Sequence, residues 1–444
     1  MDCSNCKMNV KRCKPSLVKP CGETPSTILH LSPIDSLPVL RCNARTLHVF
    51  RDSPSAEVSP ANIVREALSK ALVPYYPLAG RFKPQTYPLQ LDCSNQENGV
   101  LFVEASSDST LDSLMYLDDL SSIPFHLLLP EEHESESEAE AEALVKMQIT
   151  EFACGGFVIG LIFCHSICDG LGAAQFLKAV GEFARGIDQA PTIKPTWDRD
   201  FFPNPPQNAL INHQIAIPIP PPPLPEYSLQ HTNIDIPIDR INALKKQFQE
   251  STGITCSTFE IVAACFWRSR TRAVYEASGD DNQEIKLVFF ANCRQMVEPP
   301  LPKGFYGNCF FPVRISSWSK GIGEMPIYEV VKLIQEAKSS VGREFGEYIA
   351  QKTRESELVS DPFAPPLEYS TLFISEWGRL GFNDVDYGFG PPVHVVPIQG
   401  SAVIPVGIVG SLPLPRKGIR LMTWCVQEPH RLSFLHQISQ LLFL

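Results

Sequence analysis

The chain has 444 residues, of which 44% are hydrophobic and 20% are charged, and its formal net charge is −11. This length allows two or three domains with sizeable apolar cores, and the average charge content excludes wholesale disorder. The negative balance, without a basic stripe, argues against a nucleic-acid binder, because such proteins need cationic surface to neutralise phosphates.

Residues 1–14 are polar and basic and lack the apolar stretch of a secretory signal, and no segment reaches the roughly 20 apolar residues of a membrane span. We therefore expect a soluble, cytoplasmic protein. The 14 cysteines are scattered, and several lie in apolar runs, which predicts buried free thiols. Cys3, Cys6, Cys13 and Cys21 are not followed by a second C-x-x-C or a histidine pair, so no metal site is expected.

The first half of the chain alternates helical and strand-like patterns. One segment repeats apolar residues at helical spacing, and two apolar runs flank a Gly-Gly turn, which is typical of a β-hairpin with a fully buried second strand. The expected elements are a helix over 62–73 ended by Pro74, strands over 144–152 and 157–164, and a helix over 171–184.

Two segments have unusual composition. Residues 131–142 carry seven glutamates and predict a solvated loop, with a site for a basic partner as the alternative. Residues 202–225 contain nine prolines. They predict an extended, semi-rigid connector, with an SH3-domain ligand as the alternative.

The second half again mixes helices and strands. Ser257 and Glu260 have the S-x-x-E spacing of a capping box, which predicts a helix from there to about Val274. The other expected elements are a strand over 285–291, a helix over 327–341 and β-like runs over 393–398, 402–408 and 419–426.

Both halves therefore predict an α/β fold with two domains of similar size. We place an N-terminal domain at 1–195, a proline-rich crossover at 196–228 and a C-terminal domain at 229–444.

The segment His165-Ser166-Ile167-Cys168-Asp169-Gly170 carries the candidate chemistry. His165 follows the second buried strand, and a strand end projects a side chain at a fixed point. Histidine can accept and return a proton near neutral pH, so His165 is the candidate general base. A satisfied core histidine is the alternative, and the whole H-x-x-x-D-G pattern at a strand-to-helix junction favours the base.

Other catalytic motifs are incomplete in this chain. There is no H-E-x-x-H, G-x-S-x-G or P-loop sequence. Gly170 to Ala174 hints at a dinucleotide loop, but Gln175 stands where the last glycine would be.

The H-x-x-x-D-G motif in a chain of this length resembles that of the plant BAHD acyltransferases. The second signature of that family, D-F-G-W-G, resembles Asp386-Tyr387-Gly388-Phe389-Gly390, where two aromatic residues are exchanged. Tyr76 to Arg81 matches Y-P-L-A-G-R, Phe305 to Asn308 resembles Y-F-G-N, and Cys154 to Phe157 matches the hairpin before the histidine. Chloramphenicol acetyltransferases and peptide-synthetase condensation domains share the histidine motif, but the first are much shorter than this chain and the second usually have histidine in place of Cys164.

The resemblance implies two similar chloramphenicol-acetyltransferase-like domains, with mixed sheets and packed helices, joined by a long crossover. It also implies a tunnel between the domains, which acyl-CoA enters as co-substrate from one side and the acceptor from the other. His165 would deprotonate the acceptor hydroxyl or amine and later return the proton to the CoA thiolate. No metal and no permanently bound cofactor is implied, and we expect a monomer.

The resemblance assigns further roles. Asp169 would point away from His165 and pair with Arg294. Asp386 would be structural and lie away from the tunnel, and the two glycines after it would allow an unusual backbone turn. The expected roles are structural for Asp169, Gly170, Arg294, Asp386, Gly388 and Gly390, oxyanion or tunnel contacts for Ser375 and Trp377, and CoA contacts for Ser257, Thr258 and Asn308.

The phrases over 299–304 and 386–392 look most like family members that use benzoyl-CoA or hydroxycinnamoyl-CoA. Their acceptors include benzyl-type alcohols, monolignols and taxane alcohols, so we expect an aromatic donor and an alcohol of plant specialised metabolism, such as a phenylpropanoid. The alternatives are transfer to an amine, use of acetyl-CoA, transfer from a carrier protein, and a non-catalytic binding protein, which the intact His165 disfavours.

Overall fold

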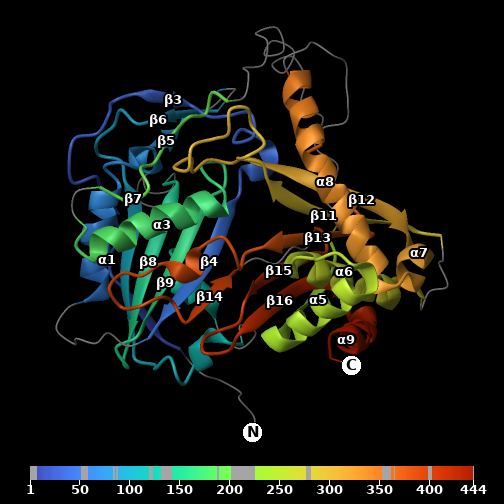
Figure 1. The fold of residues 1–444 in the computed structure, drawn as a ribbon. Helices are drawn as coiled ribbons and strands as arrows, with labels where there is room; N and C mark the ends of the chain where they lie inside the picture. Colours follow the sequence, from blue (N-terminus) through green and yellow to red (C-terminus); the bar gives the residue numbers. More distant parts are fainter. Residues whose placement is uncertain are drawn as a thin grey trace.

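The computed structural model describes residues 8–51, 59–83, 86, 89–119, 124–131, 143–187, 190–201, 226–276, 282–352, 362–364, 366–398 and 403–443. These residues form two lobes, each built on a β-sheet with packed helices (Figure 1). The proline-rich connector 202–225, nearly all of the glutamate-rich loop, and Cys3 and Cys6 lie outside the described residues.

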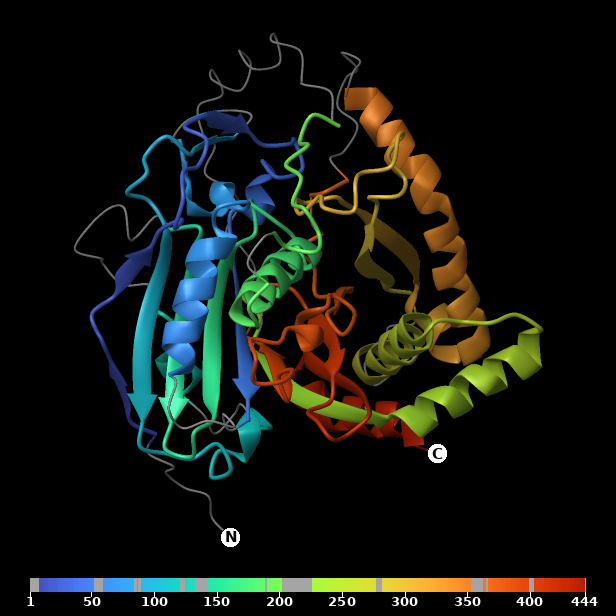
Figure 2. The ribbon, with the colours of Figure 1, turned by 60° about the vertical axis from the view of Figure 1, so that its left-hand side comes forward.

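The first lobe is built on a seven-stranded sheet that mixes parallel and antiparallel pairs. Helices α1 (Pro60–Ala71) and α3 (Gly170–Ala184) lie on one face of this sheet (Figure 2). Its strands run in the order β1 (Val10–Arg12), β7 (Val100–Ser107), β8 (Val145–Phe152), β9 (Phe157–Cys164), β4 (Asn43–Phe50) and β14 (His394–Pro397), and β2 (Ser16–Val18) also pairs with β7.

The predicted hairpin is present as β8 and β9. All residues of β9 except the last are buried, as expected for a strand covered on both faces. Helix α3 covers one face, and a loop covers the other. A side chain at Gly160 would place its Cβ 1.8 Å from the carbonyl oxygen of Leu128, so glycine allows this loop to pack directly on the strand.

The second lobe is built on a six-stranded mixed sheet, with α8 running along its outer side (Figure 1). The strands run in the order β10 (Leu229–Pro237), β16 (Gly418–Gln427), β15 (Val406–Ser411), β13 (Thr371–Glu376), β11 (Glu284–Asn292) and β12 (Phe310–Trp318). The helices are α5 (Ile238–Thr252), α6 (Thr258–Thr271), α7 (Ser319–Glu324), α8 (Ile327–Lys352) and α9 (Glu428–Phe443). A separate three-stranded sheet joins β3 (Ile28–His30), β6 (Gln90–Asp92) and β5 (Arg81–Phe82).

Several element ends differ from those expected. Helix α1 stops at Ala71, before the predicted end at 73. Helix α8 continues beyond the expected end at 341 to Lys352, because Phe345 and Tyr348 extend its apolar face and pack on Phe311 of β12. No helix of the described residues is both long and apolar enough to cross a bilayer.

One strand crosses between the halves. Strand β14 comes from the C-terminal half, yet it pairs antiparallel with β4 in the first sheet, with His394 opposite Val49. The residues before it, including Trp377, Leu380 and Phe389, pack against the core of the first lobe. The proposed C-terminal domain, 229–444, therefore contributes one segment to the other lobe, which sequence periodicity did not predict.

Candidate active site

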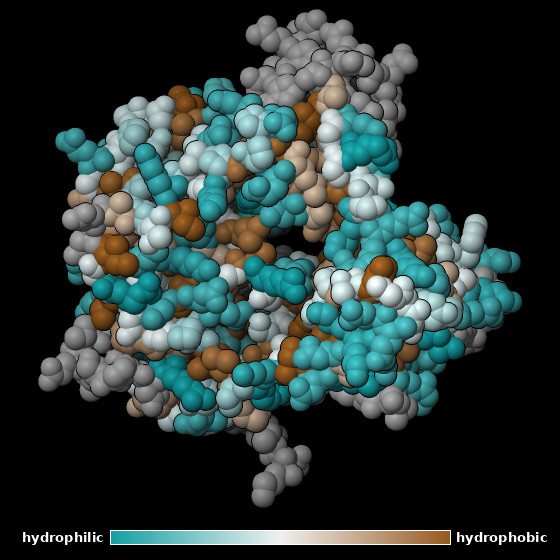
Figure 3. Space-filling view, in the orientation of Figure 1, coloured by the Kyte–Doolittle hydropathy of each residue, from teal (hydrophilic) through white to brown (hydrophobic). Residues whose placement is uncertain are grey.

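His165 lies where the two lobes meet. Its backbone N–H donates to the carbonyl oxygen of Cys42 beside the end of β9, at 2.9 Å. Its imidazole faces residues of the second lobe: Nδ1 is 3.1 Å from Oδ1 of Asn308, and the ring packs edge-on to Phe310, with the ring centroids 6.2 Å apart. Figure 3 shows a hollow between the lobes, with hydrophobic residues along its first-lobe margin.

Asp169 does not orient His165. Its Oδ1 accepts a bond from Nη2 of Arg294 at 2.8 Å and from the backbone N–H of Gly172 at 3.0 Å, so it caps the start of α3. The expected pair with Arg294 is therefore present. The next residue is Gly170, where a Cβ would lie 2.6 Å from the side chain of Leu380, so glycine allows Leu380 to pack closely here.

Asn308 requires a correction. It was expected to contact CoA, but its side chain is fully buried and its amide is engaged behind His165. The Nδ2 group donates to Oδ1 of Asp35 at 2.8 Å and to the carbonyl oxygen of His165 at 2.8 Å. Asn308 is thus part of the support of His165.

Two further residues of this support were missed in the sequence. Asp35 and Arg199 lie in loops of the first half, and each is almost completely buried next to Asn308. Neither belongs to a periodic pattern or a catalytic motif, so no local signal distinguished them.

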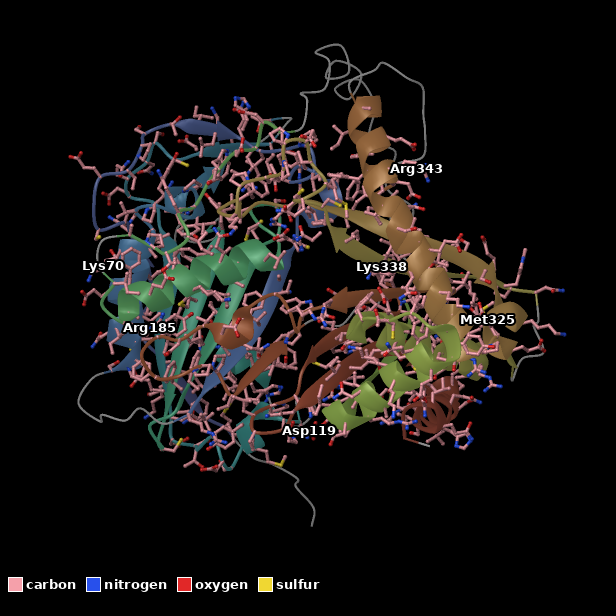
Figure 4. The ribbon with its side chains drawn as sticks, in the orientation of Figure 1. Lys70, Asp119, Arg185, Met325, Lys338 and Arg343 are labelled. Carbon is pink, nitrogen blue, oxygen red and sulfur yellow. The ribbon has the colours of Figure 1, made fainter. Side chains whose placement is uncertain are left out.

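The segment 386–390 forms a turn around one carboxylate. Oδ1 of Asp386 accepts the backbone N–H groups of Gly388 at 2.8 Å and Gly390 at 2.9 Å. Both glycines have left-handed backbones, with φ of +98° and +80°, which explains why side chains are absent there. Arg185, labelled at the end of α3 in Figure 4, donates to the carbonyl oxygen of Asp386.

The two aromatic residues of this turn anchor it to the first sheet. The ring of Tyr387 packs edge-on to Phe50, and the ring of Phe389 packs edge-on to Phe157. No hydrogen bond among the described residues joins the turn to His165. A structural role for Asp386 stays the expectation.

Ser375 and Trp377 lie together at the end of β13. The indole Nε1 of Trp377 donates to the hydroxyl oxygen of Ser375 at 3.1 Å, and its ring stacks on Phe382. Since a hydroxyl that accepts one bond still has its own proton to donate, Ser375 retains a donor for an oxyanion. The two residues are half-buried at the junction of the lobes.

Ser257 and Thr258 begin helix α6. The predicted capping box is present: Oγ of Ser257 accepts the N–H of Glu260 at 3.2 Å, and the Glu260 carboxylate accepts the N–H of Ser257 at 2.8 Å. Burial favours a higher pKa for Glu260, but bonds from Lys338 (labelled in Figure 4), Ser257 and Gln335 lower its pKa overall. This negative charge opposes a CoA phosphate at the same helix end, and the CoA contact stays a prediction.

The cysteines described by the structure are free, and seven of them are buried. Burial raises the pKa of the Cys265 thiol to about 12, which keeps it unreactive. Within the described ranges, no group of three or more His, Cys, Asp or Glu side chains could hold a metal ion.

The chain resembles known proteins over nearly its whole length. A model of the Transferase family matches residues 8–407. The chain is 38% identical over 451 residues to Acyl transferase 4 of Oryza sativa subsp. japonica, covering 97% of this chain and 98% of that one. It is 33% identical to a myricetin 3-O-glucosyl 1,2-rhamnoside 6'-O-caffeoyltransferase of Crocosmia x crocosmiiflora (97% and 98% covered). It is also 33% identical to 3'-N-debenzoyl-2'-deoxytaxol N-benzoyltransferase of Taxus canadensis (96% and 95% covered).

Solved structures share the fold. The crystal structure of vinorine synthase superposes with a TM-score of 0.72 at 21% identity, covering 98% of both chains. F. sporotrichioides TRI101 complexed with coenzyme A and T-2 gives a TM-score of 0.68 at 14% identity, covering 92% of this chain and 97% of that one. The two-lobed fold is thus shared with these solved structures. The chain belongs to the BAHD acyltransferase family.

Proposed function

We propose that this acyltransferase moves an aromatic acyl group from acyl-CoA to the hydroxyl of a small alcohol, with Nε2 of His165 as general base. The carrying observation is the contact between Nδ1 of His165 and Oδ1 of Asn308, which occupies one ring nitrogen and leaves Nε2 to accept a proton. The coenzyme A in the TRI101 structure and the acyl-transfer names of the relatives support the donor class.

In the proposed reaction, His165 takes a proton from the acceptor and later gives it to the CoA thiolate. Nε2 of His165 removes the acceptor proton as its oxygen attacks the thioester carbonyl, which forms a tetrahedral oxyanion. The hydroxyl proton of Ser375 is the proposed oxyanion donor. Collapse breaks the C–S bond, and the CoA thiolate takes the proton from Nε2, which regenerates neutral His165.

Aromatic side chains beside His165 support an aromatic acyl group. Phe310 packs edge-on to the imidazole and also contacts Phe290, with 5.1 Å between the two ring centroids. Phe290 is 50% exposed, so a wall of aromatic rings extends from His165 towards solvent. Edge and face contacts of a benzoyl or hydroxycinnamoyl ring with such a wall contribute about 0.5–1.5 kcal/mol per pair beyond burial.

The base assignment is tested by His165→Ala, assayed with free acyl-CoA and a panel of alcohols. We expect kcat to fall by about 10²- to 10⁴-fold with an unchanged melting temperature. His436→Ala, which changes an exposed histidine of α9, is the matched control and should keep wild-type turnover. A folded His165→Ala protein with more than half of the wild-type kcat would refute the base role.

The donor is tested by competition between acetyl-CoA and p-coumaroyl-CoA or benzoyl-CoA at equal concentration. We expect the aromatic product to dominate, since a pocket wide enough for a ring gains roughly 2 kcal/mol from desolvating it. Phe310→Leu should reduce the preference of kcat/KM for the aromatic donor over acetyl-CoA. Acetyl products with every accepted alcohol would overturn the donor assignment.

An amine acceptor is the second candidate, because one relative is named as an N-benzoyltransferase. The proposed proton transfer is the same for an amine. Including primary amines in the acceptor panel separates the two, and a higher kcat/KM for amines than for alcohols would replace the proposed hydroxyl.

A further inference from the structure

We propose that Asp35, neutralised by Arg199, is a positioning residue that fixes the tautomer of His165 through Asn308. The inference rests on the proposed function, in which Nε2 of His165 must be free of a proton at the start of turnover. It adds a buried ion pair of the first lobe to the support of the base.

Both carboxylate oxygens of Asp35 accept hydrogen bonds, and one of them faces Asn308. Its side chain is completely buried, and its Oδ1 accepts both the backbone N–H of Asn308 at 3.0 Å and the side-chain Nδ2 of Asn308 at 2.8 Å. Its Oδ2 accepts the backbone N–H and the hydroxyl of Ser32, at 3.1 and 2.8 Å. A carboxylate with four donors aimed at it has no proton to offer back.

The Asp35 carboxylate determines which way the side-chain amide of Asn308 points. Oxygen and nitrogen of a carboxamide have nearly the same shape, so only their partners distinguish them. One end of the Asn308 amide faces two acceptors, Oδ1 of Asp35 and the carbonyl oxygen of His165. That end must be the NH₂ group, and the oxygen is therefore turned towards His165.

The amide in turn decides the proton position on His165. Oδ1 of Asn308 lies 3.1 Å from Nδ1 of the imidazole and can only accept a bond. Nδ1 must then carry the proton of the neutral ring, and Nε2 carries the lone pair. The charge of Asp35 thus selects, through Asn308, the His165 tautomer that can act as a base.

Arg199 makes the buried charge of Asp35 tolerable. Its Nη1 lies 3.4 Å from Oδ2 of Asp35, and its Nη2 donates to the carbonyl oxygen of Ile167 at 2.9 Å. The guanidinium also lies over the rings of Trp197, Phe305 and Tyr306. A fully buried carboxylate needs such a partner, because an unpaired buried charge is strongly destabilising.

Gly307 shows how closely this pair is built into the site. A Cβ at position 307 would lie 0.9 Å from Nη1 of Arg199, so the guanidinium occupies the space of a missing side chain. Gly307 of the segment 305–308 therefore leaves space for the Arg199 guanidinium, and Asn308 beside it donates a hydrogen bond to the Asp35 carboxylate.

The test compares Asp35→Asn with Asp235→Asn. Both changes remove a carboxylate bonded to an arginine, but Asp235 pairs with Arg420 at the far junction of the lobes and has no bond to Asn308. An amide at position 35 can donate as well as accept, so the Asn308 carboxamide loses its forced orientation. We expect Asp35→Asn to lower kcat by at least about tenfold, with about 10⁴-fold as the limit for a wrong tautomer.

The decisive readout is the ¹⁵N spectrum of protein labelled only in histidine, since protonated and unprotonated ring nitrogens resonate apart. The His165 signals are those missing from His165→Ala. Wild type should show the proton on Nδ1, Asp35→Asn a mixture of tautomers, and Asp235→Asn the wild-type pattern. KM for acyl-CoA should stay within about threefold in both variants.

A proton on Nε2 in the wild-type spectrum would overturn the proposal even if Asp35→Asn does not fold. An unchanged tautomer and kcat in folded Asp35→Asn would overturn it as well. The spectrum needs no substrate, so a wrong choice of acyl donor or acceptor would leave this result intact and would appear only in the turnover assays.

Discussion

Arg420 of the second lobe contacts Asp118 of the first, with Nη1 2.7 Å from Oδ1. The same guanidinium binds Asp235 through Nε and Nη2, each at 2.7 Å, and its side chain is only 5% exposed. Asp118 follows the turn Met115–Leu117, whose residues all have left-handed backbones. Asp119, labelled in Figure 4, marks this lower junction of the lobes.

Replacing Arg420 by Met should destabilise the protein, because Asp118 and Asp235 lose the buried one of the two arginines that they share, and only the more exposed Arg416 remains. We expect the free energy of unfolding to fall by about 1–2 kcal/mol, less than for a fully buried pair, since Asp118 is 35% exposed and keeps its bond to Arg416. Urea denaturation measures the change. Arg343→Met removes an exposed pair with Glu347 and should cost under about 1 kcal/mol; equal losses in both variants would contradict the assignment.

Asp386→Ala should act on stability before chemistry. The change leaves the N–H groups of Gly388 and Gly390 without their shared acceptor, and we expect a loss of about 2 kcal/mol in unfolding free energy. Asp384→Ala, two residues earlier, removes only an exposed pair with Lys178 and should stay within about 1 kcal/mol. Thermal melts and kcat would be compared, and lost turnover with an unchanged melt would contradict the structural role.

Tyr387→Phe should be neutral or stabilising. The hydroxyl of Tyr387 is buried without a hydrogen-bond partner among the described residues, and burial raises its pKa. Removing an unsatisfied buried hydroxyl relieves a cost of about 1–3 kcal/mol, and the loss of the packing contacts of the oxygen atom cancels part of this gain. Tyr75→Phe is the control: its buried hydroxyl accepts a bond from Gln175 at 3.0 Å, so this change should destabilise by about 1 kcal/mol. Thermal melts compare the two variants: Tyr387→Phe should melt at a higher temperature than Tyr75→Phe, and the reverse order would contradict the prediction.

Two buried histidines should make stability fall in mild acid. Burial lowers the pKa of His48 to about 3, and burial with the charge of Arg420 lowers the pKa of His394 to about 4, from 6.5. Below pH 6.5 the unfolded chain binds protons that the folded chain excludes, so the stability present above pH 6.5 is lost as pH falls towards 4. Each histidine contributes a slope of about 1.4 kcal/mol per pH unit.

The slope is measured by urea denaturation at several pH values between 4.5 and 7. His394→Gln should reduce it by one histidine's share even if the variant is less stable at every pH. An unaltered slope would show that His394 takes up its proton in the folded state.

Local patterns predicted much of this molecule. The apolar run before His165 and the glycine turn before it were sufficient for β8 and β9, and Ser257 with Glu260 predicted the start of α6, because these signals lie within one element. The pairing of Asp169 with Arg294 came from the family resemblance, since the two residues are far apart in the chain.

The remaining features depend on contacts between distant segments. Asp35 and Arg199 have no neighbours in sequence that mark them, and their meaning appears only where Asn308 meets both His165 and Asp35. Strand β14 reads as a short apolar run of the C-terminal half, and nothing in that run indicates that its partner is β4. Sequence spacing places side chains on a face, but it does not identify the sheet that the face joins.

Because β14 of the C-terminal half completes the first sheet, neither half of the chain contains all the strands of its own lobe and no others. A fragment ending before the proline-rich connector would present the edge of β4 with its hydrogen-bonding groups unpaired, which is a template for strand addition. The C-terminal fragment carries the strand that fits it. A polypeptide cut within the connector should therefore reassemble by strand complementation, and the two pieces should rescue each other rather than behave as independent modules.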